Sequence, residues 1–262
     1  MTAHHIKLEK TADGIGILTI DRAEKRNAMT YAMLFAFIEK VQEVSVDDSV
    51  RVLIVTGAGG AFCAGTDLAD LSTVPGETRG VRGEAHEGDV WWPLVACPKP
   101  VIGAIDGYAV GMGAEFSSQC DVRIVTNRAR FAWNFAHRGL VPDTGAGSWI
   151  LPRLIGHSQA LRLLYSGDFL DAAEAKEIGY ANEIVVPEAL MEAALAEARR
   201  YLNSSPFSIR HMKALIYEGL ARELPEHMKA HVTALRACFN SADHKEGVAA
   251  FLGKRPAKFV GS

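Results

Sequence analysis

The sequence predicts an α/β fold: a parallel β-sheet with packed helices, followed by a helical C-terminal region. Short β-branched runs alternate with segments of helical periodicity through the first part of the chain, which is typical of βαβ units. The run at 50–56 is nearly continuous in β-branched residues, as in a strand covered on both faces, and the runs at 101–105 and 122–125 indicate the same. After about residue 187 the chain is rich in Ala, Leu, Glu and Arg and is mostly helical. We therefore predict an α/β core over residues 1–190 and a helical region over 191–262.

Individual elements follow from local patterns. The predicted strands span residues 15–20, 50–56, 101–105 and 122–125. Thr30 is predicted to cap a helix over 31–44. A short helix is predicted over 111–119 and a longer one over 188–202. Pro206 is predicted to open the next helix, and two more helices follow to about Phe251. Residues 73–90 are rich in Gly and charge, which predicts a mobile surface segment.

Composition excludes several classes of function. The 28 Lys and Arg residues nearly balance the 31 Asp and Glu residues, so nucleic acid is not expected as the main partner. No apolar run approaches the length of a membrane span, and the polar N-terminus lacks the apolar region of a signal peptide. The four cysteines are widely spaced, which favours reduced thiols over a disulfide frame or a zinc site. We expect a cytoplasmic protein with no membrane partner and no metal.

Pairs of glycines suggest a nucleotide-binding loop, but neither the dinucleotide-binding motif nor the P-loop motif is complete. Gly57 and Gly111 each open a G-x-G, and phenylalanine stands where a dinucleotide fingerprint needs its third glycine. Residues 60–66 have P-loop glycine spacing, yet Thr66 replaces the required lysine. No G-x-S-x-G elbow of a serine hydrolase is present.

Two glycine-rich turns point to a different chemistry. They follow the predicted strands at 50–56 and 101–105, so both lie at the carboxyl edge of the sheet, where ligands bind in α/β folds. Two N–H groups converging there would form an oxyanion hole. The alternative is a pair of ordinary βα turns. Glu115 stands just after the second turn in an apolar run, where a buried charge is costly unless it is paired or used.

Six segments of the chain resemble the motifs of the crotonase superfamily, the enoyl-CoA hydratase/isomerase family. They are RAEKRNAM at 22–29, AFCAGTDL at 61–68, IDGYAVGMGAE at 105–115, CDVRIVTNRARF at 120–131, GLVPDTGAGSWILPRLIG at 139–156 and KRPAKF at 254–259. The resemblance covers nearly the whole chain in the right order. It implies a crotonase-like spiral of ββα units, with a C-terminal helical region that builds homotrimers or dimers of trimers.

The resemblance also implies the chemistry. Family members bind an acyl-CoA thioester and stabilise its enolate, which assigns the oxyanion hole to the backbone N–H groups of Thr66 and Met112. Coenzyme A then arrives as part of the substrate, and no permanently bound cofactor is expected. The two turns need donate only backbone groups, so methionine at 112 does not threaten this role.

Two carboxylates are candidates for proton transfer. Glu115 matches one of the two catalytic glutamates of the family's hydratases, the alternative being a cap on its own helix. Phe135 stands where the second glutamate is expected, which puts simple hydration in doubt. Asp143 occupies the position of the catalytic acid in isomerase-type members, the alternative being a turn residue.

The remaining predicted contacts are those with coenzyme A and with the acyl group. The resemblance assigns adenine recognition to the backbone of Cys63 and Ala64. It also implies that basic side chains contact the coenzyme A, from Lys25 or Arg26 and from Lys254. The full set of predicted CoA contacts is Lys25, Arg26, Cys63, Ala64, Phe251 and Lys254, and the predicted acyl pocket is Trp133, Phe135 and His137. Lys254 is expected to act across a subunit boundary. The alternative to these ligand contacts is that the lysines are solvated surface residues and that the aromatic residues pack in the core.

Together these observations predict an enzyme that performs enolate chemistry on an unsaturated acyl-CoA. Double-bond isomerisation is favoured, with Glu115 or Asp143 carrying the proton, and hydration using both is the second hypothesis. A non-catalytic acyl-CoA binder and a thioester hydrolase on the same fold remain as further alternatives.

Overall fold

The computed structural model describes residues 5–73 and 92–262. The predicted mobile segment, residues 73–90, lies outside the described residues apart from Thr73 at its start. The strands are β1 (Ile6–Lys10), β2 (Ile15–Ile20), β3 (Val52–Gly57), β4 (Val101–Ile105), β5 (Tyr108–Val110), β6 (Val122–Thr126), β7 (Arg130–Ala132), β8 (Leu170–Asp171) and β9 (Glu183–Val185).

Helices alternate with these strands and then take over the chain. The α-helices are α1 (Tyr31–Val46), α2 (Leu68–Thr73), α3 (Pro93–Ala96), α4 (Met112–Gln119), α5 (Ala146–Trp149), α6 (Leu151–Ile155), α7 (His157–Ser166), α8 (Ala172–Glu177), α9 (Leu190–Leu202), α10 (Pro206–Gly219), α11 (Leu224–Asn240) and α12 (Ala242–Leu252). Short 3-10 turns are η2 (Ala23–Lys25), η4 (Ala136–Arg138) and η5 (Pro187–Ala189).

The main sheet has the strand order β1-β2-β3-β4-β6-β9. Only the β1–β2 pair is antiparallel, and the other neighbours are parallel. Every residue of β4 and all but the last of β3 are buried, as their uninterrupted apolar runs predict. The predicted parallel sheet is therefore confirmed, and the carboxyl ends of β3 and β4 lie side by side.

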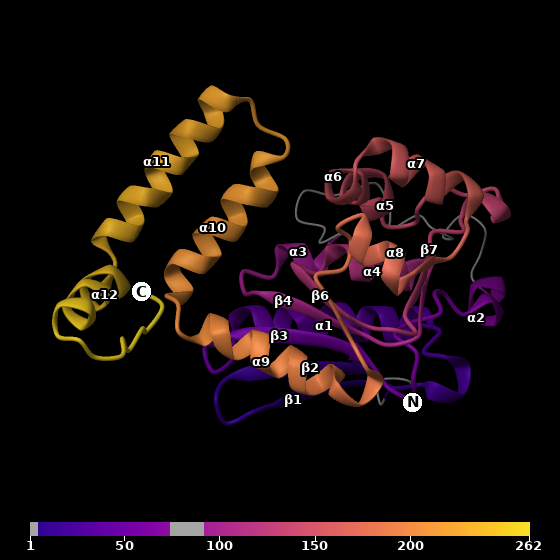
Figure 1. Ribbon diagram of the computed structural model, residues 1–262, viewed down its shortest axis with the longest axis horizontal. Helices are drawn as coiled ribbons and strands as arrows, with labels where there is room; N and C mark the ends of the chain where they lie inside the picture. The colour runs from indigo at the N-terminus through magenta and orange to yellow at the C-terminus, as the bar shows by residue number, and fades with distance from the viewer. Residues whose placement is uncertain (1–4, 74–91) are drawn as a thin grey trace.

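Residues of β3 alternate between the two faces of the sheet. Leu53 and Val55 pack in a core cluster with Phe37 of α1, whereas Ile54 packs in a second cluster with Ala194 of α9. Figure 1 shows the sheet between these two helices. The predicted boundary at 190/191 falls at the start of α9, and α9 packs on the sheet.

A second, three-stranded sheet has the order β5-β7-β8. Its strands have only two or three residues, too few for a periodic signal, and the sequence did not predict it. It lies directly beside the predicted turns, because β5 sits between the end of β4 and the start of α4.

The C-terminal helices α10, α11 and α12 form an arm that extends away from the sheet (Figure 1). We use "the arm" for residues 206–262. The predicted number and order of these helices are confirmed, as is the capping of α1 by Thr30, whose side chain accepts a hydrogen bond from Met33 N.

Candidate active site

The two glycine-rich turns predicted from the sequence meet in the structure. The Cys63 amide donates to Tyr108 O at 2.9 Å, and the Val110 amide donates to Cys63 O at 2.9 Å. Gly65, with φ of +100°, allows the close approach, since a β-carbon there would lie 2.9 Å from Val110 O and 3.8 Å from Met112 N. Backbone hydrogen bonds thus join the turn after β3 to the turn that opens α4.

The backbone amides of Thr66 and Met112 remain available at this junction. Thr66 bridges to Met29, but the hydrogen bonds of that bridge use Gly65 O and Asp67 N. Met112 is the first residue of α4, where an amide has no intrahelical acceptor. Neither amide donates to another described residue. The pair has the free donors that an oxyanion hole requires.

The loop that carries Thr66 is held from behind by residues of the RAEKRNAM segment. Asn27 is fully buried and donates to Ala58 O at 2.9 Å and Ala61 O at 2.6 Å. Arg22 forms an ion pair with Asp67 at 2.7 Å, directly after Thr66. The sequence pattern predicted no role for these two side chains. Their structural role is to fix the position of the Thr66 amide.

Glu115 is fully buried one turn into α4. Its Oε2 accepts a hydrogen bond from Thr144 Oγ at 2.7 Å. Its Oε1 has no hydrogen-bond partner among the described residues. The structure therefore presents a carboxylate with one oxygen held and the other unoccupied.

Burial raises the pKa of the Glu115 carboxyl from an ordinary 4.5 to about 7. The Thr144 hydroxyl opposes this rise, and the negative charge of Asp143 adds to it. The amides of Gly147 and Ala146 also oppose the rise, without completing a hydrogen bond of normal geometry to Oε1. A carboxyl that titrates near neutral pH can both accept and return a proton, as general acid–base catalysis requires.

Trp133 and Phe135, both predicted to line the acyl pocket, are buried beside this carboxylate and turn. A β-carbon at Gly111 would lie 3.9 Å from Phe135 Cζ, so this ring faces the turn before Met112. A β-carbon at Gly147 would lie 2.5 Å from Glu115 Oε1 and 3.1 Å from Trp133 Cδ1. His137 is exposed and packs instead against Gly167, at the end of α7.

Asp143 is exposed on the loop before α5. Burial is the main reason that the pKa of the Cys63 thiol rises to about 12, and the charge of Asp143 adds to that rise. The same charge acts on Glu115. Asp143 is therefore near both the oxyanion turn and the buried carboxylate, but in water-accessible surroundings.

The predicted adenine contacts lie on the outer side of the oxyanion turn. Lys25 and Arg26 are exposed, and the Arg26 guanidinium lies 5.5 Å from the centre of the Tyr108 ring. Cys63 is fully buried with its N–H and C=O bonded internally, and the Ala64 amide donates to Arg26 O at 3.0 Å. Of this pair, only Ala64 offers a backbone group, its carbonyl, that no described residue occupies.

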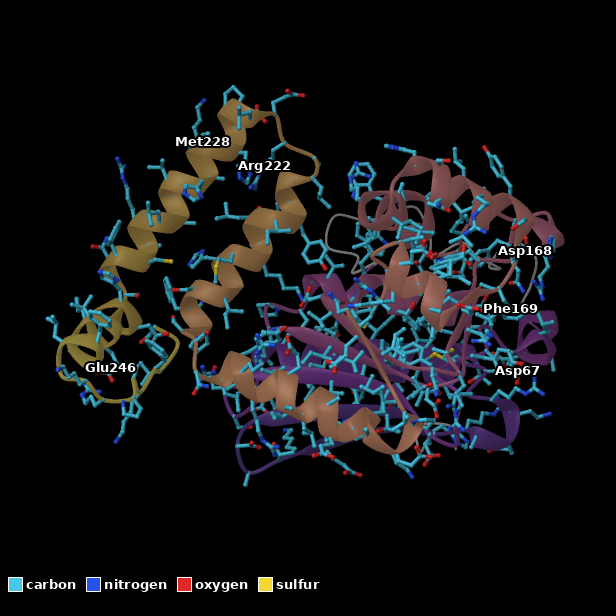
Figure 2. The ribbon with its side chains drawn as sticks, in the orientation of Figure 1. Asp67, Asp168, Phe169, Arg222, Met228 and Glu246 are labelled. Carbon is cyan, nitrogen blue, oxygen red and sulfur yellow. The ribbon has the colours of Figure 1, made fainter. Side chains whose placement is uncertain are left out.

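Phe251 and Lys254 are exposed at the end of α12, on the arm. Phe251 lines a groove of about 390 Å³ between the arm's own helices. Figure 2 shows Glu246 of α12 on the opposite side of the molecule from Asp67, which follows Thr66. Within one chain, these two predicted CoA contacts are far from the oxyanion turn.

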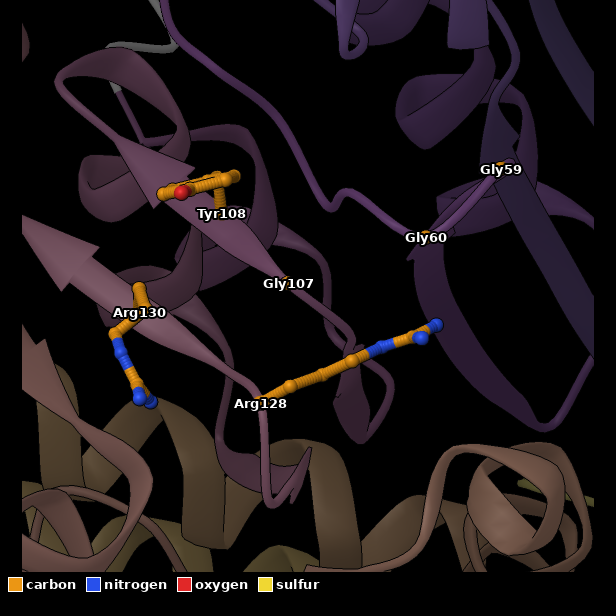
Figure 3. A pocket seen from close by; sticks show the side chains of 6 residues that line it. All are labelled: Gly59, Gly60, Gly107, Tyr108, Arg128 and Arg130. Carbon is orange, nitrogen blue, oxygen red and sulfur yellow. The ribbon is translucent and has the colours of Figure 1, made fainter.

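A basic pocket of about 490 Å³ lies behind the glycine-rich loop (Figure 3). Its lining residues are Gly59, Gly60, Gly107, Tyr108, Arg128 and Arg130, none of which was predicted for the site. Arg128 extends across it to Asp106, with hydrogen bonds of 2.7 and 2.5 Å. The Arg128 guanidinium is thus paired with Asp106 and lies against Gly60 of the glycine-rich loop.

In residues 5–73 and 92–262, no group of three His, Cys, Asp or Glu side chains is arranged to hold a metal ion. Within the same ranges, the helices lack the length and apolar character needed to cross a membrane.

Comparison with known proteins gives the family. A family model described as enoyl-CoA hydratase/isomerase matches residues 10–262. A crotonyl-CoA hydratase of Syntrophomonas wolfei is 36% identical, covering 99% of both chains, and a 1,2-epoxyphenylacetyl-CoA isomerase of Escherichia coli is 35% identical, covering 97% of this chain and 98% of its own. The crystal structure of an enoyl-CoA hydratase from Bacillus anthracis superposes with a TM-score of 0.90 at 29% identity, covering 98% of this chain and 100% of its own.

The chain belongs to the enoyl-CoA hydratase/isomerase family of the crotonase superfamily. It has the crotonase fold with its C-terminal helices, and it is an enzyme of the hydratase/isomerase class.

Thr144 and Gly147 lie against Glu115, and the sequence pattern predicted no role for either. Thr144 holds Glu115, Trp92 donates to Thr144 O at 2.8 Å, and Gly147 leaves room for Glu115 Oε1. The only sequence signal of Thr144 and Gly147 is their place in the GLVPDTGAGSW motif, which gives no hint of a contact with α4, and Trp92 lies outside this motif.

Proposed function

We propose that this enzyme moves a double bond in an unsaturated acyl-CoA, converting a 3-enoyl-CoA into its 2-enoyl isomer. One observation carries the proposal. A single buried carboxylate with a free oxygen, Glu115, lies near two unoccupied amides, and apolar Phe135 stands where a second catalytic glutamate is expected. Isomerisation needs one proton carrier, whereas hydration in this family uses two carboxylates to hold water.

The reaction takes two proton transfers. Ionised Glu115 removes a proton from C2, and the electrons of the broken C–H bond delocalise through C3 and C4 and onto the thioester oxygen. The amides of Thr66 and Met112 stabilise that oxyanion, a contribution of a few kcal/mol for each donor. Protonated Glu115 then delivers the proton to C4, which leaves the double bond between C2 and C3. The pKa of Glu115, near 7, suits both transfers.

Hydration of a 2-enoyl-CoA is the second candidate function. Asp143 supports it, since its charge reaches Glu115 and it lies where water has access. The similarity to a crotonyl-CoA hydratase of Syntrophomonas wolfei also supports it. In this candidate, Asp143 and Glu115 together hold and activate one water.

Two ultraviolet assays separate these functions. A rise in conjugated-thioester absorbance with a 3-enoyl-CoA indicates isomerisation, and a fall with a 2-enoyl-CoA, with recovery of 3-hydroxyacyl-CoA, indicates hydration. Asp143→Asn should reduce isomerisation by less than about tenfold but hydration by about 100-fold or more, because only hydration requires both carboxylates. Absence of both reactions would contradict the proposal. Binding without turnover would then favour the non-catalytic binder, and release of free CoA would favour the hydrolase.

The proposal includes assembly into a homotrimer or a dimer of trimers through the arm. Exposed apolar side chains on the arm support it, among them Ile216 at 66% and Phe239 at 56% exposure. In such an assembly Lys254 and Phe251 reach the acyl-CoA of a neighbouring copy. Light scattering should give the mass of three or six chains, and Ile216→Glu should lower it. A monomeric wild-type protein would contradict this assembly.

A further inference from the structure

Thr144 lies between the proposed proton carrier and an indole group. Its hydroxyl donates to Glu115 Oε2 at 2.7 Å, and its backbone oxygen accepts from Trp92 Nε1 at 2.8 Å. The same hydroxyl oxygen accepts from Ala146 N at 3.3 Å. The Thr144 side chain is buried, at 7% exposure, so these protein groups define its surroundings.

The direction of these hydrogen bonds fixes the proton of Thr144. A hydroxyl has one proton to donate and accepts through its oxygen. The Ala146 amide can only donate, so the Thr144 proton is directed at Glu115 Oε2. Trp92 can likewise only donate, and it holds the Thr144 backbone in place. The resulting chain runs from Trp92 through Thr144 to one oxygen of Glu115.

We propose that Thr144 is a positioning residue that locks the rotation of the Glu115 carboxylate and leaves Oε1 as the oxygen that takes up and returns the substrate proton. The inference rests on the proposed function, in which Glu115 is the proton carrier. Oε2 is occupied by a donor in the ionised state, and Oε1 has no partner among the described residues. A hydrogen bond donated to a carboxylate also stabilises its ionised form, so Thr144 keeps Glu115 available as a base at neutral pH.

The test compares Thr144→Val, which removes the hydroxyl, with Thr144→Ser, which keeps it. The titration of Glu115 is followed by NMR in protein labelled with ¹³C at the glutamate carboxyl, with Glu115→Gln used to assign its signal. In Thr144→Val the midpoint should rise by about one pH unit, as expected for loss of a hydrogen bond to a charged group. The acidic limb of kcat/KM for the 3-enoyl-CoA should move equally, with kcat reduced more than KM changes. Thr144→Ser should restore the wild-type values of all three.

An unchanged Glu115 titration in Thr144→Val would overturn the inference. Should that variant fail to fold, Trp92→Phe provides a second test, because it removes only the donor to Thr144 O and should raise the midpoint by a smaller amount. No shift in Trp92→Phe would then overturn it. The titration is independent of turnover. Failure of the proposed function appears as an inactive wild-type enzyme, and failure of this inference as a carboxyl that does not respond to Thr144.

Discussion

The core buries its apolar side chains, whereas the arm exposes many of its own. In the core, β4 is completely buried and helices cover both faces of the sheet. In the arm, α10 buries only Lys213 and α11 only Ala234, while apolar residues such as Ile216 and Phe239 are exposed. Within residues 5–73 and 92–262, the core buries its apolar side chains, and the arm has apolar side chains that no other described residue covers. This difference supports the two proposals made above, that the chemistry takes place in the core and that the arm contacts another copy.

The largest expected difference between the core and the arm is in the effect of a glycine-to-alanine substitution on kcat. Gly147 in the core has no room for a side chain, because a β-carbon there would lie 2.5 Å from Glu115 Oε1. Gly147→Ala should displace the carboxylate and lower kcat by about 100-fold, the cost of a misplaced catalytic group. Gly247 on the arm is the matched control, since its nearest neighbour would be 3.5 Å away. Equal activity of Gly147→Ala and Gly247→Ala would remove the distinction.

Lys213 joins the arm to the core. Its ammonium group donates to Leu94 O at 2.9 Å, Lys99 O at 3.0 Å and Asp121 Oδ2 at 2.8 Å, from a position with 8% exposure. Lys213→Met should lower the free energy of unfolding by about 3 kcal/mol, because it leaves a partly buried carboxylate without its cation. Urea denaturation measures the change.

Lys229→Met provides the control for that variant, because Lys229 is exposed on α11 of the same arm. A surface substitution of this kind should change stability by less than about 0.5 kcal/mol. If both lysine variants unfold at the same urea concentration, the joint between arm and core is not where we place it.

Glu115 should also make stability depend on pH. Burial raises its pKa to about 7 in the folded protein, against an ordinary 4.5 in the unfolded chain. The folded state therefore holds an extra proton between these values, and its contribution, fully present below pH 4.5, is lost as pH rises through about 7. The loss amounts to roughly 3 kcal/mol at 1.4 kcal/mol per pKa unit. Denaturation at pH 5 and pH 8 should show a smaller decrease in Glu115→Gln than in wild type, and parallel curves would refute this origin.

The smallest expected effect belongs to the arm. Lys254→Ala should raise KM for acyl-CoA about threefold with little change in kcat, because an exposed ion pair with phosphate contributes less than about 1 kcal/mol. Steady-state kinetics at two salt concentrations measures it, and the difference from wild type should shrink at high salt. A fall in kcat instead would place Lys254 in the chemistry of the core.

The sequence predicted those parts of the fold that have a local signal. The runs that became β3, β4 and β6 are long and β-branched, whereas β5, β7 and β8 are too short to show a period. Glu115 stood out because a charge in an apolar run needs a reason. Thr144 did not, because its contact with Glu115 exists only once the chain has folded. Likewise, no local pattern predicts that Lys254 lies far from the oxyanion turn of its own chain, and only the family resemblance implied that it acts across a subunit boundary.

In the proposed reaction, Glu115 transfers the proton. The most direct measurement is the rate of 3-enoyl-CoA isomerisation by Glu115→Gln, with acyl-CoA affinity measured by calorimetry and Glu39→Gln, an exposed glutamate on α1, as the control. We expect a fall in kcat of roughly 10³-fold, unchanged affinity, and a fully active control. Turnover by Glu115→Gln within tenfold of the wild-type rate would contradict it.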